Sequence, residues 1–296
     1  MSSLNSAPVT VRFFLPDEAL KPYISTLYLT EVNIADSERV SDYLHPEWAN
    51  LRFFNPATMI AAVGDQEPAV APAFGVLGPT SKATYFSAST IRMWGIGLLP
   101  LGWAKFIGKS AEDYVDRTCD GDADPAFGDF APLRKKLFGS KQPDPKNEAA
   151  ALNRHLAGLL ESAPEDDILV RRAHEILVDP DLVTVQAMAD RLNITGRTLD
   201  RLSRRAFGFA PKLLLQRQRF LRSLAENMLN PSQNWISSLD PQYYDQAHFG
   251  RDFKRFMGMS ATEYKAQPHP FMNAAVHSRM AAAGAGMQVL HDPAKD

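Results

Sequence analysis

Cysteine is nearly absent from this sequence, with Cys119 the only one among 296 residues. A single cysteine excludes a disulfide framework and any CxxC metal or redox site within the chain. Long apolar runs are missing too, because none approaches the roughly 20 residues that a membrane span needs. The first residues, MSSLNSAPVT, have neither the charged start nor the apolar core of a signal peptide. We therefore expect a soluble, cytoplasmic protein with no membrane partner.

The linear motifs of common enzyme classes are also missing. The sequence contains no GxSxG elbow, no P-loop, no GxGxxG after a strand and no HExxH. The seven histidines are scattered, and neither a metal nor another cofactor is expected. These absences favour a protein that is not an enzyme. Two carboxylates that meet only in the fold would leave no such trace, so an enzyme with its site in the N-terminal part stays an alternative.

The net charge of −2 is small but unevenly distributed. Residues 1–164 hold 15 Lys+Arg and 19 Asp+Glu, a net charge of −4, whereas residues 165–268 hold 15 and 13, a net charge of +2. The stretch from Arg197 to Arg222 has eight basic residues and one acid, Asp200. A solvated helix face explains many charge runs, but a basic helix face also attracts DNA phosphates. The spacing of the residues favours the second explanation.

A helix that begins near Thr195 would have one polar and one apolar side. At roughly 100° per residue, Leu199, Leu202 and Ala206 share the apolar side. The polar side carries the first set of predicted DNA-binding residues: Arg197, Asp200, Arg201, Arg204 and Arg205. Arginine suits this role because its planar fork can donate to both O6 and N7 of guanine. Asp200 could accept from a cytosine amino group or pair with Arg204 four residues later.

A second helix precedes this one. Its apolar residues follow helical spacing: Val185, Met188, Ala189 and Leu192. Thr184 is a suitable N-cap for it, and Thr195 is a suitable N-cap for the basic helix. The turn between them is short, at residues 193–195. Two helices joined by a tight turn, the second with a basic outer face, predict a helix-turn-helix unit.

A similar recognition helix is predicted around YYDQAHFGRDFKRFMG. Asp245 is its N-cap, and a stripe of phenylalanines, Phe249, Phe253 and Phe256, seats the helix on a core. The opposite face carries Ala247, Arg251 and Lys254. Gln246 could contact adenine N6 and N7, or it could be a solvated residue of the first turn.

One long helix is expected between the two units. It runs from Lys212 to Leu229, with Pro211 at its first position and Pro231 past its end. Its length of about 27 Å compares with roughly 34 Å between successive major-groove faces on one side of B-DNA. The helix could therefore hold both recognition helices on one side of a duplex.

These segments resemble the AraC/XylS family of transcription regulators. The matching residues are RTLDRLSRRAFGFAPK with RQRFLRSLA, then YYDQAHFGRDFKRFMG with EY, within roughly Glu165 to Gln267. The resemblance implies that each of two helix-turn-helix units presents a recognition helix to double-stranded DNA. The residues implied to face bases are Arg197, Asp200 and Arg201 in the first unit, and Gln246, Ala247 and Arg251 in the second.

The segment WISSLDPQYYD departs from the family pattern. It is a residue short where the first helix of the second unit should lie, and it contains Pro241, while Gln242 replaces the usual glycine. This departure motivates a second alternative, an interaction module whose degenerate second unit no longer binds DNA.

From Val9 to about Leu99 the pattern changes to short apolar and aromatic runs divided by proline and glycine. Such runs predict strands in a sandwich or barrel. The resemblance implies that this part is a sensor or dimerisation domain, often of cupin-like fold, but the His-x-His pair of a metal-binding cupin is missing. Six aromatic residues could line an apolar pocket, although each is more simply a core residue: Tyr28, Trp48, Phe53, Phe54, Trp94 and Trp103.

The expected organisation is α+β. A β-rich sensor or dimerisation domain (residues 1–140) precedes a linker (141–164) that carries an amphipathic helix from Glu148 to Glu161, which packs on the sensor domain or on a second copy. The all-α DNA-binding domain (165–267) follows, and then a flexible tail (268–296) that is rich in small residues. Double-stranded DNA is the expected partner. RNA polymerase, an unidentified small-molecule effector and a second copy of the chain are further candidates.

Overall fold

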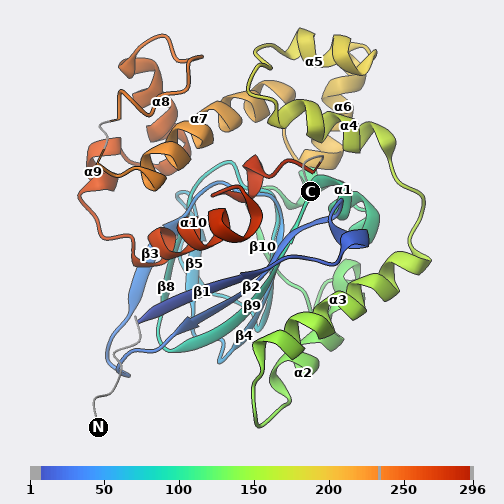
Figure 1. The fold of residues 1–296 in the computed structure, drawn as a ribbon, viewed down its shortest axis with the longest axis vertical. Helices are drawn as coiled ribbons and strands as arrows, with labels where there is room; N and C mark the ends of the chain where they lie inside the picture. Colours follow the sequence, from blue (N-terminus) through green and yellow to red (C-terminus); the bar gives the residue numbers. More distant parts are fainter. Residues whose placement is uncertain (1–7, 233–234, 294–296) are drawn as a thin grey trace.

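The computed structural model describes residues 8–232 and 235–293. The described strands all lie within residues 9–120, and most of the helices follow them in the chain (Figure 1). The predicted α+β class, with a β-rich N-terminal domain and a helical C-terminal domain, is confirmed. Most of MSSLNSAPVT, on which the expectation about a signal peptide rests, lies outside the described residues.

Within the described residues, ten strands form two antiparallel sheets. The strands are β1 (Val9–Phe14), β2 (Ile24–Val32), β3 (Val40–Leu44), β4 (Asn50–Asn55), β5 (Ile60–Val63), β6 (Ala69–Val70), β7 (Phe74–Leu77), β8 (Thr84–Ala88), β9 (Ile91–Leu98) and β10 (Thr118–Asp120). The larger sheet has the order β1-β2-β9-β4-β7-β10, and the smaller has the order β3-β8-β5-β6. Side chains from both sheets line one cavity, so the sheets face each other across it.

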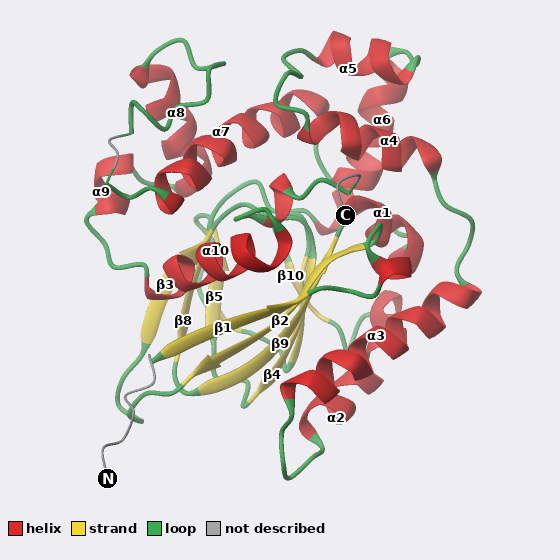
Figure 2. Cartoon of the chain, in the orientation of Figure 1, coloured by secondary structure: helices red, strands yellow, loops and turns green. Residues whose placement is uncertain are grey.

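The helices lie mostly beyond one end of the sheets and along one side of them (Figure 2). They are α1 (Pro100–Gly102), α2 (Pro132–Phe138), α3 (Pro145–Ser162), α4 (Ile168–Val178), α5 (Val185–Leu192), α6 (Gly196–Phe207), α7 (Pro211–Leu229), α8 (Gln246–Met257), α9 (Ala261–Lys265) and α10 (Pro270–Ala283). Short turns of other helical types are η1 (Glu18–Leu20), η2 (Trp103–Ile107), η3 (Ala111–Tyr114), η4 (Pro125–Phe130) and η5 (Gln288–Leu290). None of the helices in the described ranges is long and apolar enough to cross a membrane.

The amphipathic helix α3 packs on the β-rich domain. Leu152 and Leu156 are fully buried, and the indole of Trp94 donates to the Glu148 carboxylate at 2.8 Å. Of the two predicted uses of this helix, packing on its own domain is therefore the one that the fold shows.

The expectation of a flexible tail is wrong for the described residues 270–291. Helix α10 lies against the sheets (Figure 1) and buries Phe271, Met272 and Val276. Its N-terminus is fixed by the Asp42 carboxylate, which accepts from the backbone N–H groups of Phe271 and Met272 at 3.1 and 2.9 Å. The small residues misled the prediction because they allow close packing on a surface that belongs to the other end of the chain.

Candidate DNA interface and ligand pocket

The first helix-turn-helix unit forms where the sequence predicts it. The Thr184 hydroxyl accepts from the Ala187 N–H at 3.0 Å and caps α5, while the Thr195 hydroxyl accepts from the Thr198 N–H at 3.2 Å and caps α6. Between them Asn193 adopts a left-handed conformation with φ of 55°, which asparagine tolerates better than most residues. These two caps and this turn set the angle at which α6 leaves α5.

Helix α6 divides into a buried and an exposed face. Leu199, Leu202 and Ala206 are buried in the core, as their spacing predicts. Arg197 and Arg201, one helical turn apart, are exposed, and neither has a hydrogen-bond or ion-pair partner among residues 8–232 and 235–293. The N-terminal half of α6 therefore offers two unengaged guanidinium groups to solvent.

The other predicted residues of α6 are engaged within the chain. The Arg204 guanidinium donates to Asp200 on the same helix at 3.0 Å and to Glu112 on η3 at 2.8 Å. Arg205 donates to Asp167, the N-cap of α4, at 2.6 Å. For Asp200 the sequence left two roles open, a contact with cytosine or an ion pair with Arg204, and the structure contains the ion pair. The C-terminal half of α6 thus faces the β-rich domain.

Helix α8 also forms as predicted. The Asp245 carboxylate caps it by accepting from the His248 N–H at 2.7 Å. Phe249, Phe253 and Phe256 are buried and pack around Phe220 of α7, with ring centroids 5.0 to 6.2 Å apart. The remaining predicted residues are all exposed on the other face: Gln246, Ala247, Arg251 and Lys254.

The second unit differs from the first because no helix forms in residues 235–245, which run as turns before α8. Hydrogen bonds hold this segment in place instead. Asp240 accepts from the Arg222 guanidinium of α7 at 2.5 Å, and the Gln242 amide donates to the Pro180 carbonyl at 2.8 Å. Pro180 precedes α5, so Gln242 ties the second unit to the first.

A partly buried ion pair fixes α8 on α7. Arg219 of α7 donates to Asp252 of α8 at 2.6 Å, and the Tyr243 hydroxyl donates to the same carboxylate at 3.0 Å. The Arg219 guanidinium also lies 4.4 Å from the centre of the Tyr243 ring. The Tyr243 pKa is raised, mainly by burial and then by the nearby Asp252. The exposed face of α8 is therefore held at a defined orientation.

Helix α7 has 19 residues, which corresponds to about 28 Å. It separates α6 from α8 (Figure 1). Its Arg217 also anchors it to the β-rich domain: this side chain is fully buried, donates to the Thr80 carbonyl at 2.8 Å and lies 3.9 Å from the centre of the Trp48 ring. Helix α7, which lies between the two recognition helices, is thus hydrogen-bonded directly to the β-rich domain.

Two further contacts join the β-rich domain to the second unit. The Ala83 N–H donates to the carbonyl of Phe256 at 2.7 Å. The His45 Nε2 atom lies 2.8 Å from the hydroxyl of Tyr264 on α9. Together with the Glu112–Arg204 pair, these contacts place the β-rich domain against parts of both units.

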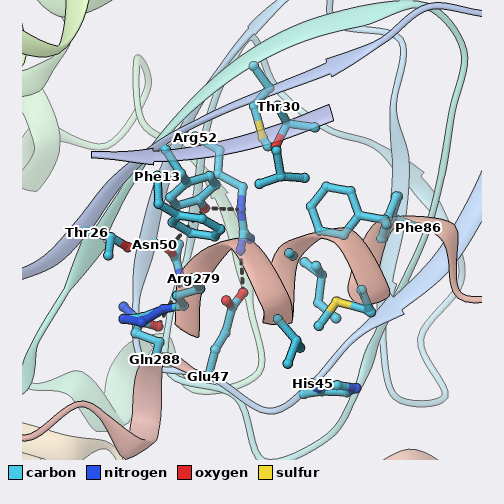
Figure 3. Close-up of a pocket in the computed structure, with 18 of the residues that line it drawn as sticks. Phe13, Thr26, Thr30, His45, Glu47, Asn50, Arg52, Phe86, Arg279 and Gln288 are labelled. Carbon is cyan, nitrogen blue, oxygen red and sulfur yellow. Dashed lines mark hydrogen bonds and ion pairs between the residues drawn. The ribbon is translucent and has the colours of Figure 1, made fainter. Parts of the chain in front are cut away.

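A pocket opens between the two sheets, and α10 forms one of its walls (Figure 3). The wall is mainly apolar, with side chains such as Val11, Phe86, Met93 and Val276. The chain after the helix-turn-helix region therefore supplies part of the same pocket as strands β1, β2, β3, β4, β8 and β9.

Polar groups gather on one side of this pocket (Figure 3). The Arg52 guanidinium donates to the Glu47 carboxylate at 2.5 Å and to the Tyr28 hydroxyl at 2.9 Å. Tyr28 in turn donates to Asn50 at 3.0 Å, and the Asn50 amide donates to Gln288 at 3.1 Å. Burial raises the pKa of Glu47, while the positive charge of Arg52 opposes this effect.

Of the six aromatic residues considered for a pocket, Tyr28 lines this cavity, whereas Trp48, Phe53, Trp94 and Trp103 are core residues and Phe54 lies at a smaller pocket. The polar residues Glu47, Arg52 and Gln288 were missed, because nothing in the sequence indicates that a strand and the C-terminal segment meet. The alternation of Thr26, Tyr28, Thr30 and Val32 along β2 was the one available signal, since a period of two marks one face of a strand. Within the described ranges, no group of three or more His, Cys, Asp or Glu residues could hold a metal ion.

A family model described as a helix-turn-helix domain matches residues 188–267. No curated protein matches the chain. Among solved structures, ToxT from Vibrio cholerae is 10% identical with a TM-score of 0.44, over 77% of this chain and 97% of that chain. Wild-type ToxT from the same organism with a bound unsaturated fatty acid is 11% identical with a TM-score of 0.41, over 79% of this chain and 97% of that chain. The AraC-like transcriptional activator CuxR is 14% identical with a TM-score of 0.25, over 74% of this chain and 88% of that chain.

Proposed function

Because this chain carries an AraC-type helix-turn-helix domain at residues 188–267, we propose that it regulates transcription by binding specific DNA sequences through α6 and α8. The observation that carries this proposal is the pair of exposed arginines, Arg197 and Arg201, on the N-terminal half of a recognition helix whose other face is buried. The N-terminal half of such a helix is the part that reaches base edges in a major groove.

The proposed DNA surface has two parts. In the first unit Arg197, Asp200 and Arg201 face the bases, and Arg204 and Arg205 become available to phosphates when they leave their partners Glu112 and Asp167. In the second unit the surface consists of Gln246, Ala247, Arg251 and Lys254. The length of α7, about 28 Å, supports simultaneous contact with two adjacent major grooves.

The proposed domains are a β-rich sensor (residues 1–140), a linker with α3 (141–164) and the DNA-binding domain (165–267). Residues 270–291 are assigned to the sensor because they line its pocket. Ligand occupancy of that pocket is proposed to adjust DNA binding through the contacts that join the two domains. A second copy of the chain and RNA polymerase are further proposed partners, and the protein is proposed to have no catalytic activity.

Selection of genomic DNA tests the proposal. Purified protein is incubated with sheared genomic fragments at about 150 mM salt, a physiological ionic strength, and the recovered fragments are sequenced. We expect a few enriched fragments that share a motif of about two helical turns. Uniform recovery, or no recovery both with and without extracts of the host cell as a source of effector, would contradict sequence-specific regulation.

Replacing Arg201 with alanine is expected to weaken binding to the selected site by about 1–3 kcal/mol and to relax the preference at one base pair. The reason is the loss of a paired contact with a guanine edge. Fluorescence anisotropy on the site and on single-base variants measures both effects. Arg154→Ala on α3, which removes another exposed arginine, is the matched control and should bind as the wild type does. An equal loss on every sequence would make Arg201 a phosphate contact instead.

The alternative of a degenerate second unit is tested by Arg251→Ala. If α8 contacts DNA, this change weakens binding to the selected site, and the shared motif covers two grooves. Unchanged affinity together with a motif confined to one groove would favour the alternative, in which residues 235–267 serve only to hold α7.

Replacing Glu112 with glutamine is expected to strengthen DNA binding and its salt dependence. The change removes the ion pair that holds Arg204 on the β-rich domain. A freed Arg204 that neutralises one more phosphate steepens the slope of log K against log salt by about 0.9. Titrations at several salt concentrations measure the slope. Glu161→Gln on α3 removes an equal charge from an exposed site and should leave it unchanged, and an unchanged slope in Glu112→Gln would show that Arg204 does not reach DNA.

A further inference from the structure

Tyr244 stands directly before Asp245, the N-cap of α8, and its side chain is 93% exposed. The next most exposed large apolar side chain in the described ranges is that of Ile168, at 67%. Among residues 8–232 and 235–293, no hydrogen bond, ion pair or ring contact joins Tyr244 to another side chain. Neither the ring nor the hydroxyl of Tyr244 therefore takes part in the packing of the described chain.

The buried neighbour Tyr243 explains why Tyr244 points outward. The Tyr243 ring packs edge-on against Phe249 at 5.3 Å, and its hydroxyl donates to Asp252 at 3.0 Å. These contacts place Tyr243 on the core side of the chain just before α8. The side chain of Tyr244 is consequently left on the solvent side, next to the exposed residues Gln246 and Ala247.

The first helix-turn-helix unit differs at this position. There Ile194 directly precedes the N-cap Thr195, and its side chain packs against the hydrophobic core. In the second unit the residue that packs on the core is Tyr243, which lies one place earlier relative to the N-cap. The residue next to the N-cap of α8 is thus available for a contact outside the chain.

The segment that carries Tyr244 is held in place by hydrogen bonds. The Asp240 N–H donates to the Ser223 hydroxyl of α7 at 2.8 Å, and the Asp240 carboxylate accepts from the Gln242 N–H at 2.9 Å. The Gln242 amide in turn donates to the Pro180 carbonyl at 2.8 Å. Because the main chain is fixed on both sides of Tyr244, a contact with an outside partner has to order little more than one side chain.

The distribution of charge around α8 favours a particular partner for this hydroxyl. Residues 235–250 contain neither lysine nor arginine, and the basic residues of α8 begin at Arg251. The first turn of a recognition helix enters the major groove, so residues just before it lie at the edge of the groove, beside the phosphates. Tyrosine hydroxyls are among the groups that hydrogen-bond to DNA phosphates. At this end of α8 the phosphates therefore meet neutral donors, of which the Tyr244 hydroxyl is one.

We propose that the Tyr244 hydroxyl donates a hydrogen bond to a backbone phosphate at the edge of the groove that α8 enters, and so fixes the position of α8 on the duplex. This inference rests on the proposed function, because DNA has to reach α8 for the contact to form. The acceptor is an anionic oxygen and the donor is neutral, so the contact strengthens binding without neutralising a phosphate charge. A contact of this kind positions the helix and reads no base.

The first experiment compares Tyr244→Phe with the wild type by fluorescence anisotropy on the selected site and on its single-base variants. We expect binding to weaken about tenfold on all these duplexes alike, because a hydrogen bond to a charged group is lost. The slope of log K against log salt should stay unchanged, since tyrosine carries no charge. Tyr85→Phe removes a hydroxyl on β8 that lies 3.4 Å from the Ser41 hydroxyl, and this matched control should bind as the wild type does. Urea midpoints should be equal for the wild type and Tyr244→Phe, because the side chain is exposed.

The second experiment uses duplexes in which one phosphate at a time is replaced by an uncharged methylphosphonate. At one position the replacement should weaken the wild type and cause no further loss in Tyr244→Phe. If the two losses add at every position, the phosphate contact is refuted. Two other results would also overturn it: a loss confined to one base pair, which indicates a base contact, and a loss in Tyr244→Ala without one in Tyr244→Phe, which indicates a contact of the ring alone.

The same titrations separate this inference from the proposed function. Specific binding by the wild type together with unaffected Tyr244→Phe and Tyr244→Ala variants would refute the phosphate contact and leave the proposed function standing. Equal binding of the wild type to every duplex would refute the proposed function, and Tyr244→Phe would still test the phosphate contact on those duplexes. No binding of the wild type to any duplex would refute both.

Discussion

Replacing Arg217 with alanine is expected to lower the free energy of unfolding by about 2–4 kcal/mol. Arg217 is a fully buried cation between the two domains, where it donates to the Thr80 carbonyl and lies against the rings of Trp48 and Phe209 at 3.9 and 5.2 Å. Alanine leaves a cavity beneath these rings and an unpaired carbonyl. Urea unfolding followed by tryptophan fluorescence measures the loss, since Trp48 lies at the site.

Arg217→Met is the informative control. Burial lowers the pKa of Arg217 to about 9, which shows how unfavourable this environment is for the charge, although the group stays protonated at neutral pH. Methionine fills most of the space and removes the buried cation, and such replacements are often neutral or stabilising. We therefore expect Arg217→Met to lie within about 1 kcal/mol of the wild type. If Arg217→Met destabilised the protein as much as Arg217→Ala does, the contact between the domains would depend on the charge of Arg217 and not on its packing.

Lowering the pH from about 6.5 to 4.5 is expected to remove roughly 4–5 kcal/mol from the free energy of unfolding, at about 1.4 kcal/mol per pH unit for each of two buried histidines. Burial lowers the pKa of both His45 and His174 to about 3. In the unfolded chain these rings take up protons below their usual pKa of 6.5, whereas in the folded chain they do not. The unfolded state then binds more protons, so stability falls as the pH falls through this window.

His269 does not offset this loss. Burial alone would lower its pKa, but hydrogen bonds to Asp42 and to the Tyr264 carbonyl raise it above the usual value. Its stabilising contribution is complete below the unfolded pKa of 6.5 and is lost as the pH rises through the raised folded pKa. It therefore adds no slope between pH 6.5 and 4.5.

His174→Phe tests the origin of the acid sensitivity. The His174 ring lies edge-on to Trp48 at 5.9 Å and near Phe207 at 6.3 Å, so a phenyl ring suits the site. Urea midpoints across the pH range should show about half the wild-type slope. His277→Gln, a change at an exposed histidine of α10, should keep the full slope. An unaltered slope in His174→Phe would assign the acid sensitivity to other groups.

The helix-turn-helix elements could be predicted because their determinants are local. The caps Thr184, Thr195 and Asp245 lie within three residues of the N–H groups that they satisfy, and apolar spacing identifies the buried faces of α6 and α8. Proline at the first position gave the start of α7 by the same local logic.

The contacts between the domains could not be predicted in this way. Arg204 and Glu112 are 92 residues apart, and His45 and Tyr264 are 219 apart, so no periodicity relates them. The same limit explains why residues 270–291 read as a tail: alanine and glycine show no amphipathic stripe, and only the surface beneath α10 explains its burial. Residues 235–245, where no helix forms, could be predicted in part. The sequence shows that this segment is short and contains Pro241, but it does not show the contacts that Gln242 makes instead.

The position of α10 also has a consequence for biosynthesis. A ribosome releases the strands of the β-rich domain first, helices α6 and α8 next, and α10 after both. The pocket cannot acquire its last wall until residues 270–290 have emerged, so for an interval the nascent chain has its helix-turn-helix region while the pocket is still open. During that interval Phe86 and Met93 lack the neighbours Phe271 and Val276 with which they line the pocket, and closure of the pocket has to wait for a segment encoded some 180 residues downstream.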